Sequence, residues 1–183
     1  MSLANWFVFG FTVIFLVYFA YATPIIVLGV WRYKKRGFGD APGEDWDPPN
    51  VSVLVPVKNE EKVVGRLLDA LVRLDYPKEN LEVVVVEDQS RDRTFQICKS
   101  FADKYPWIKV YHRDSSLGKG DALNFAFHKS SGEIIATFDA DDIPEPQAVT
   151  KALRYFNNPE TGAVHGYHRV LNLRESIVSR LAA

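Results

Sequence analysis

Hydrophobic residues follow two different patterns along the chain. From Trp6 to Trp31 the residues are almost continuously aliphatic or aromatic, and the first 31 residues carry no charged side chain. After residue 50, short apolar runs alternate with segments in which apolar residues recur every three or four positions. The first pattern is typical of a membrane-spanning helix, and the second predicts strands and helices that share a soluble core.

The N-terminal run is long enough to cross a bilayer. At about 1.5 Å per residue, residues 6–31 would form a helix of about 39 Å, which exceeds a hydrocarbon core of about 30 Å. Tilt, or a kink near Pro24, would accommodate the excess. A cleaved signal peptide is the alternative, but it should have a basic N-terminal region and a shorter apolar core. We therefore expect an uncleaved anchor.

Positive charge follows the apolar run at once, as Arg32, Lys34, Lys35 and Arg36. Basic residues beside a span stay on the cytoplasmic side. This predicts a single-pass protein of the cell membrane with its N-terminus outside and its soluble domain cytoplasmic. We expect a membrane anchor with its basic flank over 1–36, a linker rich in Gly, Pro and acid over 37–50, and a soluble domain over 51–183.

The soluble part alternates strand and helix patterns. We expect strands over 51–57, 81–86, 107–111, 133–138 and 163–170. Between them we expect a helix that Asn59 caps and that ends at Tyr76-Pro77, then helices through about Tyr105, over 121–129 and over 146–157. Continuous β-branched runs are typical of strands covered on both faces. The alternation predicts an α/β fold with a mostly parallel sheet and flanking helices.

Composition narrows the possibilities further. The net charge is −1, so there is no electrostatic case for nucleic acid as a partner. Apolar residues make up 47% and aromatic residues 13% of the chain, which excludes a disordered protein. The single cysteine, Cys98, lies among apolar helical positions and is predicted to be a small buried hydrophobe. The four histidines show no strong metal-ligand spacing.

Acidic residues crowd together just after the apolar run 134–138. Asp139, Asp141 and Asp142 place three carboxylates in four positions. Crowded carboxylates repel each other, and a divalent cation is a common reason to keep them together. Their hard oxygen atoms suit Mg²⁺ or Mn²⁺, with a phosphate-bearing ligand completing the coordination shell. A solvated turn after a strand explains this segment equally well when it is considered alone.

The predicted topology places these acids near other polar residues that follow strands. Ligands of parallel sheets bind beyond the carboxyl ends of the strands. Residues 56–60, 87–88 and 139–142 all lie at or after such ends, so Asp88, Asp139 and Asp141 are expected to share one site. The chain has no G-x-G-x-x-G after its first strand, and the segment 118–120 lacks the spacing of a P-loop. Lys119 in that segment is either a phosphate ligand or a solvated loop lysine.

Four segments in this order resemble the motifs of family 2 glycosyltransferases: Val-Ser-Val-Leu-Val-Pro-Val-Lys-Asn-Glu (51–60), Val-Val-Val-Val-Glu-Asp-Gln-Ser-Arg-Asp-Arg-Thr (83–94), Gly-Lys-Gly-Asp-Ala-Leu-Asn (118–124) and Phe-Asp-Ala-Asp-Asp (138–142). The resemblance implies a Rossmann-like GT-A fold and an inverting enzyme that uses a nucleotide-diphospho-sugar and Mg²⁺ or Mn²⁺. The preceding anchor resembles the membrane-bound branch, which includes cellulose, chitin, hyaluronan and poly-N-acetylglucosamine synthases. Residues 162–166, with Asn172, Glu175 and Ser176, also look like that branch.

The resemblance implies a role for each matching residue. Pro56, Asn59 and Glu60 would lie by the base and ribose, and Asp88 would bind the base, most often uracil. A carboxylate suits the N–H of an imide, which is a donor. Lys119 and Asn124 would line the nucleotide side. Asp139 would contact the nucleotide or ribose and, with Asp141, would hold the metal at the diphosphate.

No catalytic residue is identifiable in this chain. The family places its general base, in a T-E-D-like motif, well beyond the metal motif, so we expect the base beyond Ala183. The chain would then contain a donor half and lack an acceptor half, either as a truncated product or as part of a split enzyme.

The resemblance thus implies a membrane-anchored inverting glycosyltransferase that takes a sugar from a nucleotide-diphospho-sugar, expected to be a UDP-sugar, and adds it to a glycan or lipid-linked acceptor. The alternative is a non-catalytic, membrane-tethered nucleotide-sugar-binding protein, or half of a split enzyme whose protein partner supplies the acceptor half. Nucleotidyl transfer on a similar sheet is disfavoured, because the expected glycine-rich basic signature is absent.

Overall fold

The computed structural model describes residues 3–35, 47–115 and 117–167. By its internal contacts the chain divides into two compact units, residues 1–39 and 40–183. The predicted linker 37–50 lies mostly outside the described residues, as do Asn172, Glu175 and Ser176.

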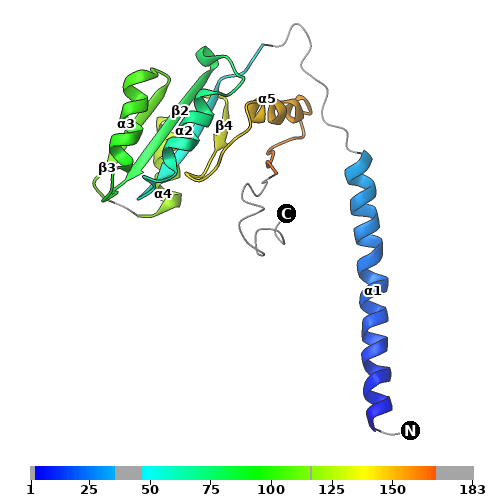
Figure 1. The fold of residues 1–183 in the computed structure, drawn as a ribbon. Coiled ribbons are helices and arrows are strands. Elements are labelled where there is room, and N and C mark those ends of the chain that lie inside the picture. The colour runs from blue at the N-terminus through cyan, green and yellow to red at the C-terminus, as the bar shows by residue number, and fades with distance from the viewer. Residues whose placement is uncertain (1–2, 36–46, 116, 168–183) are drawn as a thin grey trace. The chain divides into compact units, whose positions relative to one another are not determined.

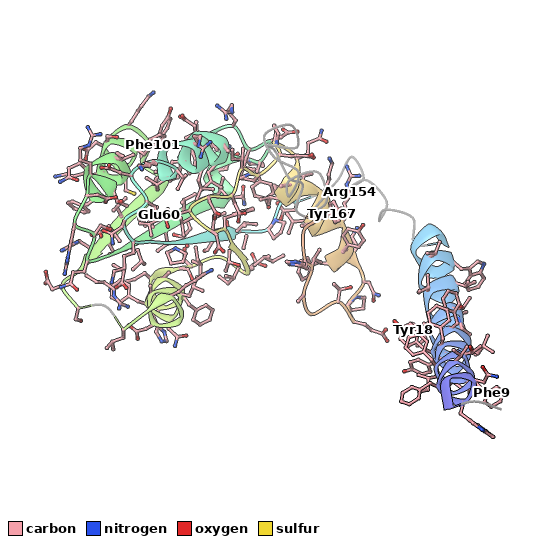
Figure 2. The ribbon with its side chains drawn as sticks, turned by 60° about the horizontal axis from the view of Figure 1, so that its bottom comes forward. Phe9, Tyr18, Glu60, Phe101, Arg154 and Tyr167 are labelled. Atoms are coloured by element: carbon pink, nitrogen blue, oxygen red, sulfur yellow. The ribbon has the colours of Figure 1, made fainter. Side chains whose placement is uncertain are left out.

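The first unit contains one long helix, α1 (Leu3–Lys35), which continues through Pro24. Its segment Asn5–Trp31 is long enough and apolar enough to cross a membrane. Large apolar side chains are exposed all round this helix, and Figure 2 shows Phe9 and Tyr18 standing away from its axis. A helix that is apolar on every side is typical of one surrounded by lipid or by other apolar segments.

The second unit is built on a parallel sheet of four strands in the order β3-β2-β1-β4 (Figure 1). The strands are β1 (Val51–Val57), β2 (Leu81–Asp88), β3 (Ile108–Arg113) and β4 (Ile134–Thr137). The helices are α2 (Val64–Val72), α3 (Thr94–Lys104), α4 (Lys119–Lys129) and α5 (Ala148–Leu153), with 3₁₀ turns η1 (Lys78–Asn80) and η2 (Arg154–Asn157). The predicted α/β class and parallel sheet are confirmed.

Helices cover both faces of the sheet, with α2 and α3 on one side and α4 on the other (Figures 1 and 2). Successive side chains of a strand point to opposite faces, and the core follows this alternation. One cluster joins the first face to α2, α3 and α5 through Val53, Val55, Val83, Val85, Leu67, Leu71, Cys98 and Val149. The other joins Leu54, Val84 and Val86 to Ala122 and Ala126 of α4. Burial on both faces explains why these strands are continuous apolar runs.

Three sequence predictions have clear outcomes here. Cys98 is fully buried, and burial raises the pKa of its thiol to about 12, so it is the inert hydrophobe that was predicted. The prediction that Asn59 caps the next helix is wrong, because α2 begins at Val64 and has no side-chain cap. The strand predicted over 163–170 is also wrong for its described part: residues 163–167 pair with no strand of the sheet, and 168–170 lie outside the described residues.

A hydrogen-bond network closes the amino edge of the sheet around Glu82. Its carboxylate accepts hydrogen bonds from Lys109 Nζ (2.6 Å), from Ser52 Oγ, and from the backbone N–H and Oγ of Ser131. Burial by itself would raise the pKa of Glu82, but these donors lower it to about 2. Gly132 N–H donates to Ser52 Oγ at 2.7 Å, which brings the start of β4 against β1.

Gly132→Ala tests this close approach. A Cβ at Gly132 would lie 2.6 Å from both the backbone nitrogen and Oγ of Ser52, and 2.9 Å from the Asn50 carbonyl oxygen. Because backbone cannot move aside cheaply, we expect a loss of about 2 kcal/mol in the free energy of unfolding, measured by denaturant titration of the full chain in detergent. Gly65→Ala is the control, since its Cβ would make an ordinary 3.8 Å contact with Ile97. Equal stability of the two variants would contradict the assignment.

Candidate functional site

The direction of chain crossover reverses at β1. From β1 the chain moves outward through β2 to β3 with α2 and α3 on one face, and then returns through α4 to place β4 on the other side of β1. In such sheets the ligand crevice forms beyond the carboxyl ends of the strands that flank the reversal. Here those ends lead into Lys58–Glu61 after β1 and Phe138–Asp142 after β4. Two of the predicted site segments therefore lie at the switch point, and the third, 87–88, is the end of the neighbouring strand β2.

The loops after β1 and β2 are bound to each other. Backbone N–H groups of one loop donate to side chains of the other in both directions: Asn59 to Ser90 Oγ (2.9 Å), Glu60 to Thr94 Oγ1 (2.8 Å), Glu61 to Asp92 Oδ2 (3.2 Å), Arg91 to Asn59 Oδ1 (2.8 Å) and Arg93 to Glu61 Oε2 (3.1 Å). Asn59 holds a left-handed backbone with φ of 56°. Its side-chain Oδ1 is occupied by the N–H of Arg91, and α2 begins only at Val64, so Asn59 is not in a position to cap that helix.

Asp88, the last residue of β2, is 4% exposed and faces a cation that sequence reasoning missed. Arg113 Nε, at the end of β3, lies 3.0 Å from Asp88 Oδ1, and Arg113 NH1 lies 2.6 Å from Asp121 Oδ2. The guanidinium group also lies over the ring of Phe125, 5.8 Å from its centroid. Arg113 thus connects the buried carboxylate of Asp88 to the first turn of α4.

The same turn contacts the acidic segment after β4. Lys119 Nζ lies 2.6 Å from Asp139 Oδ1, and Asp139 N–H donates to Asp142 Oδ2 at 2.8 Å. The side chains of Lys119 and Asp139 are both more than half exposed, and Asp141 is exposed. The first turn of α4 therefore bridges two predicted site residues, Asp88 through Arg113 and Asp121, and Asp139 through Lys119.

The remaining predicted residues lie on the elements around this edge. Pro56 is partly buried near the end of β1, Glu60 is partly buried in the following loop, and Asn124 is exposed on α4. Asp139 and Asp141 supply two carboxylates, and no group of three or more His, Cys, Asp or Glu residues is placed to hold a metal ion within the described ranges. A cation here would depend on phosphate oxygens and water for its other ligands.

Two surface hollows of the domain lie away from these residues. One, of about 430 Å³, is lined by Asp75, Glu145, Pro146, Gln147 and Lys151, and the other, of about 210 Å³, lies between α2 and α3. None of the predicted site residues lines either hollow.

A model of the family described as glycosyl transferase family 2 matches residues 52–174. The chain belongs to glycosyl transferase family 2. It is 44% identical over 136 residues to a probable glycosyltransferase, YdaM, of Bacillus subtilis, across 72% of this chain and 32% of that protein. It is 36% identical over 126 residues to the beta-monoglucosyldiacylglycerol synthase of a Synechocystis species, across 68% of this chain and 26% of that protein. This member of the family thus spans about a third or less of the length of these relatives.

Solved structures of the family share this fold. The mannosyltransferase PcManGT of Pyrobaculum calidifontis, in complex with GDP-Man and Mn²⁺, has a TM-score of 0.68 and 32% identity, over 80% of this chain and 44% of that one. Residues 1–349 of Staphylococcus aureus TarS, in complex with UDP-GlcNAc, have a TM-score of 0.57 and 28% identity, over 67% of this chain and 38% of that one. The predicted family and its GT-A fold are confirmed.

Arg113→Met tests the electrostatic connection at this edge. The variant keeps most of the apolar volume but removes the cation from a buried carboxylate, so we expect a loss of about 3 kcal/mol in the free energy of unfolding. Adding Asp88→Asn to Arg113→Met should recover part of that loss, because the buried charge is then gone. Denaturant titrations of the wild type, both single variants and the double variant measure the coupling. Strictly additive effects would show that the two groups do not interact.

Proposed function

We propose that this chain supplies the donor-binding part of a membrane-anchored, inverting glycosyltransferase. The enzyme would take a sugar from a nucleotide-diphospho-sugar, with UDP as the nucleotide, and add it to a polysaccharide or glycolipid. One observation carries the proposal. Within a family 2 fold, Asp88 is linked through Arg113, and Asp139 through Lys119, to the first turn of α4. These contacts lie at the edge where such sheets bind ligands.

The residues divide into a base side and a phosphate side. Asp88, at the end of β2, would accept a hydrogen bond from the base, while Pro56, Asn59 and Glu60 after β1 would border the base and ribose. Because the loops after β1 and β2 are bound to each other, this side is largely preorganised. A preformed pocket wall reduces the entropy lost on binding.

The phosphate side is formed by the first turn of α4 and the segment after β4. Asp139 and Asp141 fit a divalent cation, since both are exposed hard-oxygen ligands beside a place where a diphosphate could complete the shell. Such a cation would neutralise charge on the departing diphosphate. Lys119 Nζ, held at 2.6 Å from Asp139, places an ammonium group at the same point, and Asn124 lies further along the helix.

The membrane part of the proposal rests on α1. One helix apolar enough to span, followed by basic residues, supports a cell-membrane protein with its N-terminus outside and this domain cytoplasmic. The named activity of the Synechocystis relative, a glucosyldiacylglycerol synthase, supports a lipid acceptor. The likeness to polysaccharide synthases remains a prediction.

Sugar transfer by the full-length protein, reconstituted in lipid, tests the proposal. We expect release of UDP from at least one UDP-sugar in the presence of Mn²⁺ or Mg²⁺, and loss of that activity with EDTA. GDP-mannose serves as the competing donor. Donor binding without turnover would instead favour a non-catalytic nucleotide-sugar-binding protein. Absence of binding to any nucleotide-sugar by a folded protein would overturn the assignment.

Two variants separate the phosphate side from the base side. Asp141→Asn should weaken UDP binding about tenfold with Mn²⁺ and leave binding without metal unchanged, because it removes one charged ligand. Asp88→Ala should weaken UDP binding by a similar factor with and without metal. Asp103→Asn, an exposed acid near the end of α3, is the charge-matched control. Calorimetry that shows unchanged UDP affinity for Asp141→Asn in Mn²⁺ would contradict its role.

A further inference from the structure

A second acid, Glu87, lies next to Asp88 at the end of β2. Glu87 is completely buried, although its neighbour Asp88 faces the candidate site. The register of β2 on β3 sets Glu87 opposite His112 and Asp88 opposite Arg113. Adjacent strand residues point to opposite faces, so the two acid–base pairs lie back to back across the sheet. The Glu87–His112 pair lies on the α3 face.

Each carboxylate oxygen of Glu87 has its own partner. Oε1 accepts the backbone N–H of Ser90, and Oε2 binds Nδ1 of His112. Ser90 Oγ in turn accepts the backbone N–H of Asn59 at 2.9 Å. A continuous chain of hydrogen bonds therefore runs from His112 through Glu87 and Ser90 to Asn59, in the loop after β1.

Because Glu87 is completely buried, its carboxylate needs both of these hydrogen-bond partners. A buried carboxylate that loses a hydrogen-bond partner keeps its desolvation penalty, so loss of the His112 contact would destabilise the end of β2. Two other contacts of His112 are with Asp114, whose Oδ1 lies 3.5 Å from Nε2, and with Phe95 of α3, whose ring lies 5.3 Å from the imidazole. Cys98 of α3 is a buried neutral thiol, and Asp92 lies in the loop before α3.

We propose that Glu87 and His112 are positioning residues for the base side of the donor site. Their hydrogen bonds hold the end of β2, and with it Asp88, and hold the loop after β2 against the loop that contains Asn59. Neither side chain needs to touch the donor. The inference rests on the proposed function, because it assumes that Asp88 and the loop of Asn59 bind the nucleotide.

The same two strands carry a second cross-strand pair that serves as an internal comparison. Glu82 of β2 binds Lys109 Nζ of β3 at 2.6 Å, at the opposite edge of the sheet. Loss of that pair should lower stability without changing the loops at the carboxyl edge. The comparison separates a local positioning effect from a general effect of weakening the β2–β3 ladder.

The test uses the full chain in detergent, with UDP as the probe and calorimetry with and without Mn²⁺. His112→Leu removes the donor while it keeps an apolar contact for Phe95, and we expect about tenfold weaker UDP binding. His112→Asn keeps a neutral N–H near the position of Nδ1, and we expect affinity within about twofold of the wild type. Lys109→Met is the matched control, with lower stability and unchanged UDP affinity. In the transfer assay His112→Leu should raise KM for the donor far more than it lowers kcat.

A pH profile gives a second readout. The hydrogen bond to Glu87 raises the pKa of His112, and burial opposes this only in part. A charged imidazolium donates a stronger hydrogen bond than a neutral ring. The charged state is complete well below the ordinary histidine pKa and is lost as pH rises through the raised value. Wild-type UDP affinity should therefore fall as pH rises through that range, while the His112→Asn variant should not share this dependence.

Each outcome decides between specific alternatives. Unchanged UDP affinity in a folded His112→Leu variant, or an equal loss in Lys109→Met, would overturn the positioning role while the proposed function stands. A wild-type protein that is folded and binds neither UDP nor GDP would overturn the proposed function, and the inference with it. Parallel pH profiles for the wild type and His112→Asn would show that another group controls the dependence.

Discussion

Backbone pairing of β1 on both of its sides is the constraint on which the rest of this domain depends. β1 is hydrogen-bonded in parallel to β2 along its whole length and to β4 over its first four residues. Parallel pairing sends the carboxyl ends of all three strands to one edge, and the reversal of crossover direction at β1 puts α2 and α3 on one face of the sheet and α4 on the other. Without this geometry, Asp88 and Asp139 would be two unrelated turn acids.

Ion pairs then connect the strand ends and loops that the sheet brings near one another. β2 ends in two consecutive acids and β3 in two consecutive bases, and the register pairs them one to one on opposite faces. One pair points toward α4 and its first turn, and the other toward α3. Buried charges are tolerated only when paired, so these contacts specify both the register of the two strands and the position of the loops that follow them.

The sequence indicated which segments would lie at one edge of the sheet, but it did not indicate which side chains would contact each other there. Asp88, Lys119 and Asp139 were identified from the sequence, and all lie at one edge of the sheet. Arg113 and His112 were missed, because the strand predicted over 107–111 stops before them and single basic residues after a strand carry no distinctive signal. Asn59 was assigned to a local cap, whereas its side chain bonds to a loop about thirty residues away in the chain.

The sequence alone determined the apolar helix, the alternation of strands and helices, and the family, because these depend on local periodicity and on short ordered motifs. The tertiary structure decided which acids pair with basic side chains and which loops are hydrogen-bonded to each other. It also decided that residues 163–167 do not extend the sheet, where a strand-like pattern lacked a pairing partner. These outcomes depend on register and on contacts between residues far apart in the chain. The pattern of residues along the chain does not specify such contacts, because the same pattern is compatible with several sets of neighbours in space.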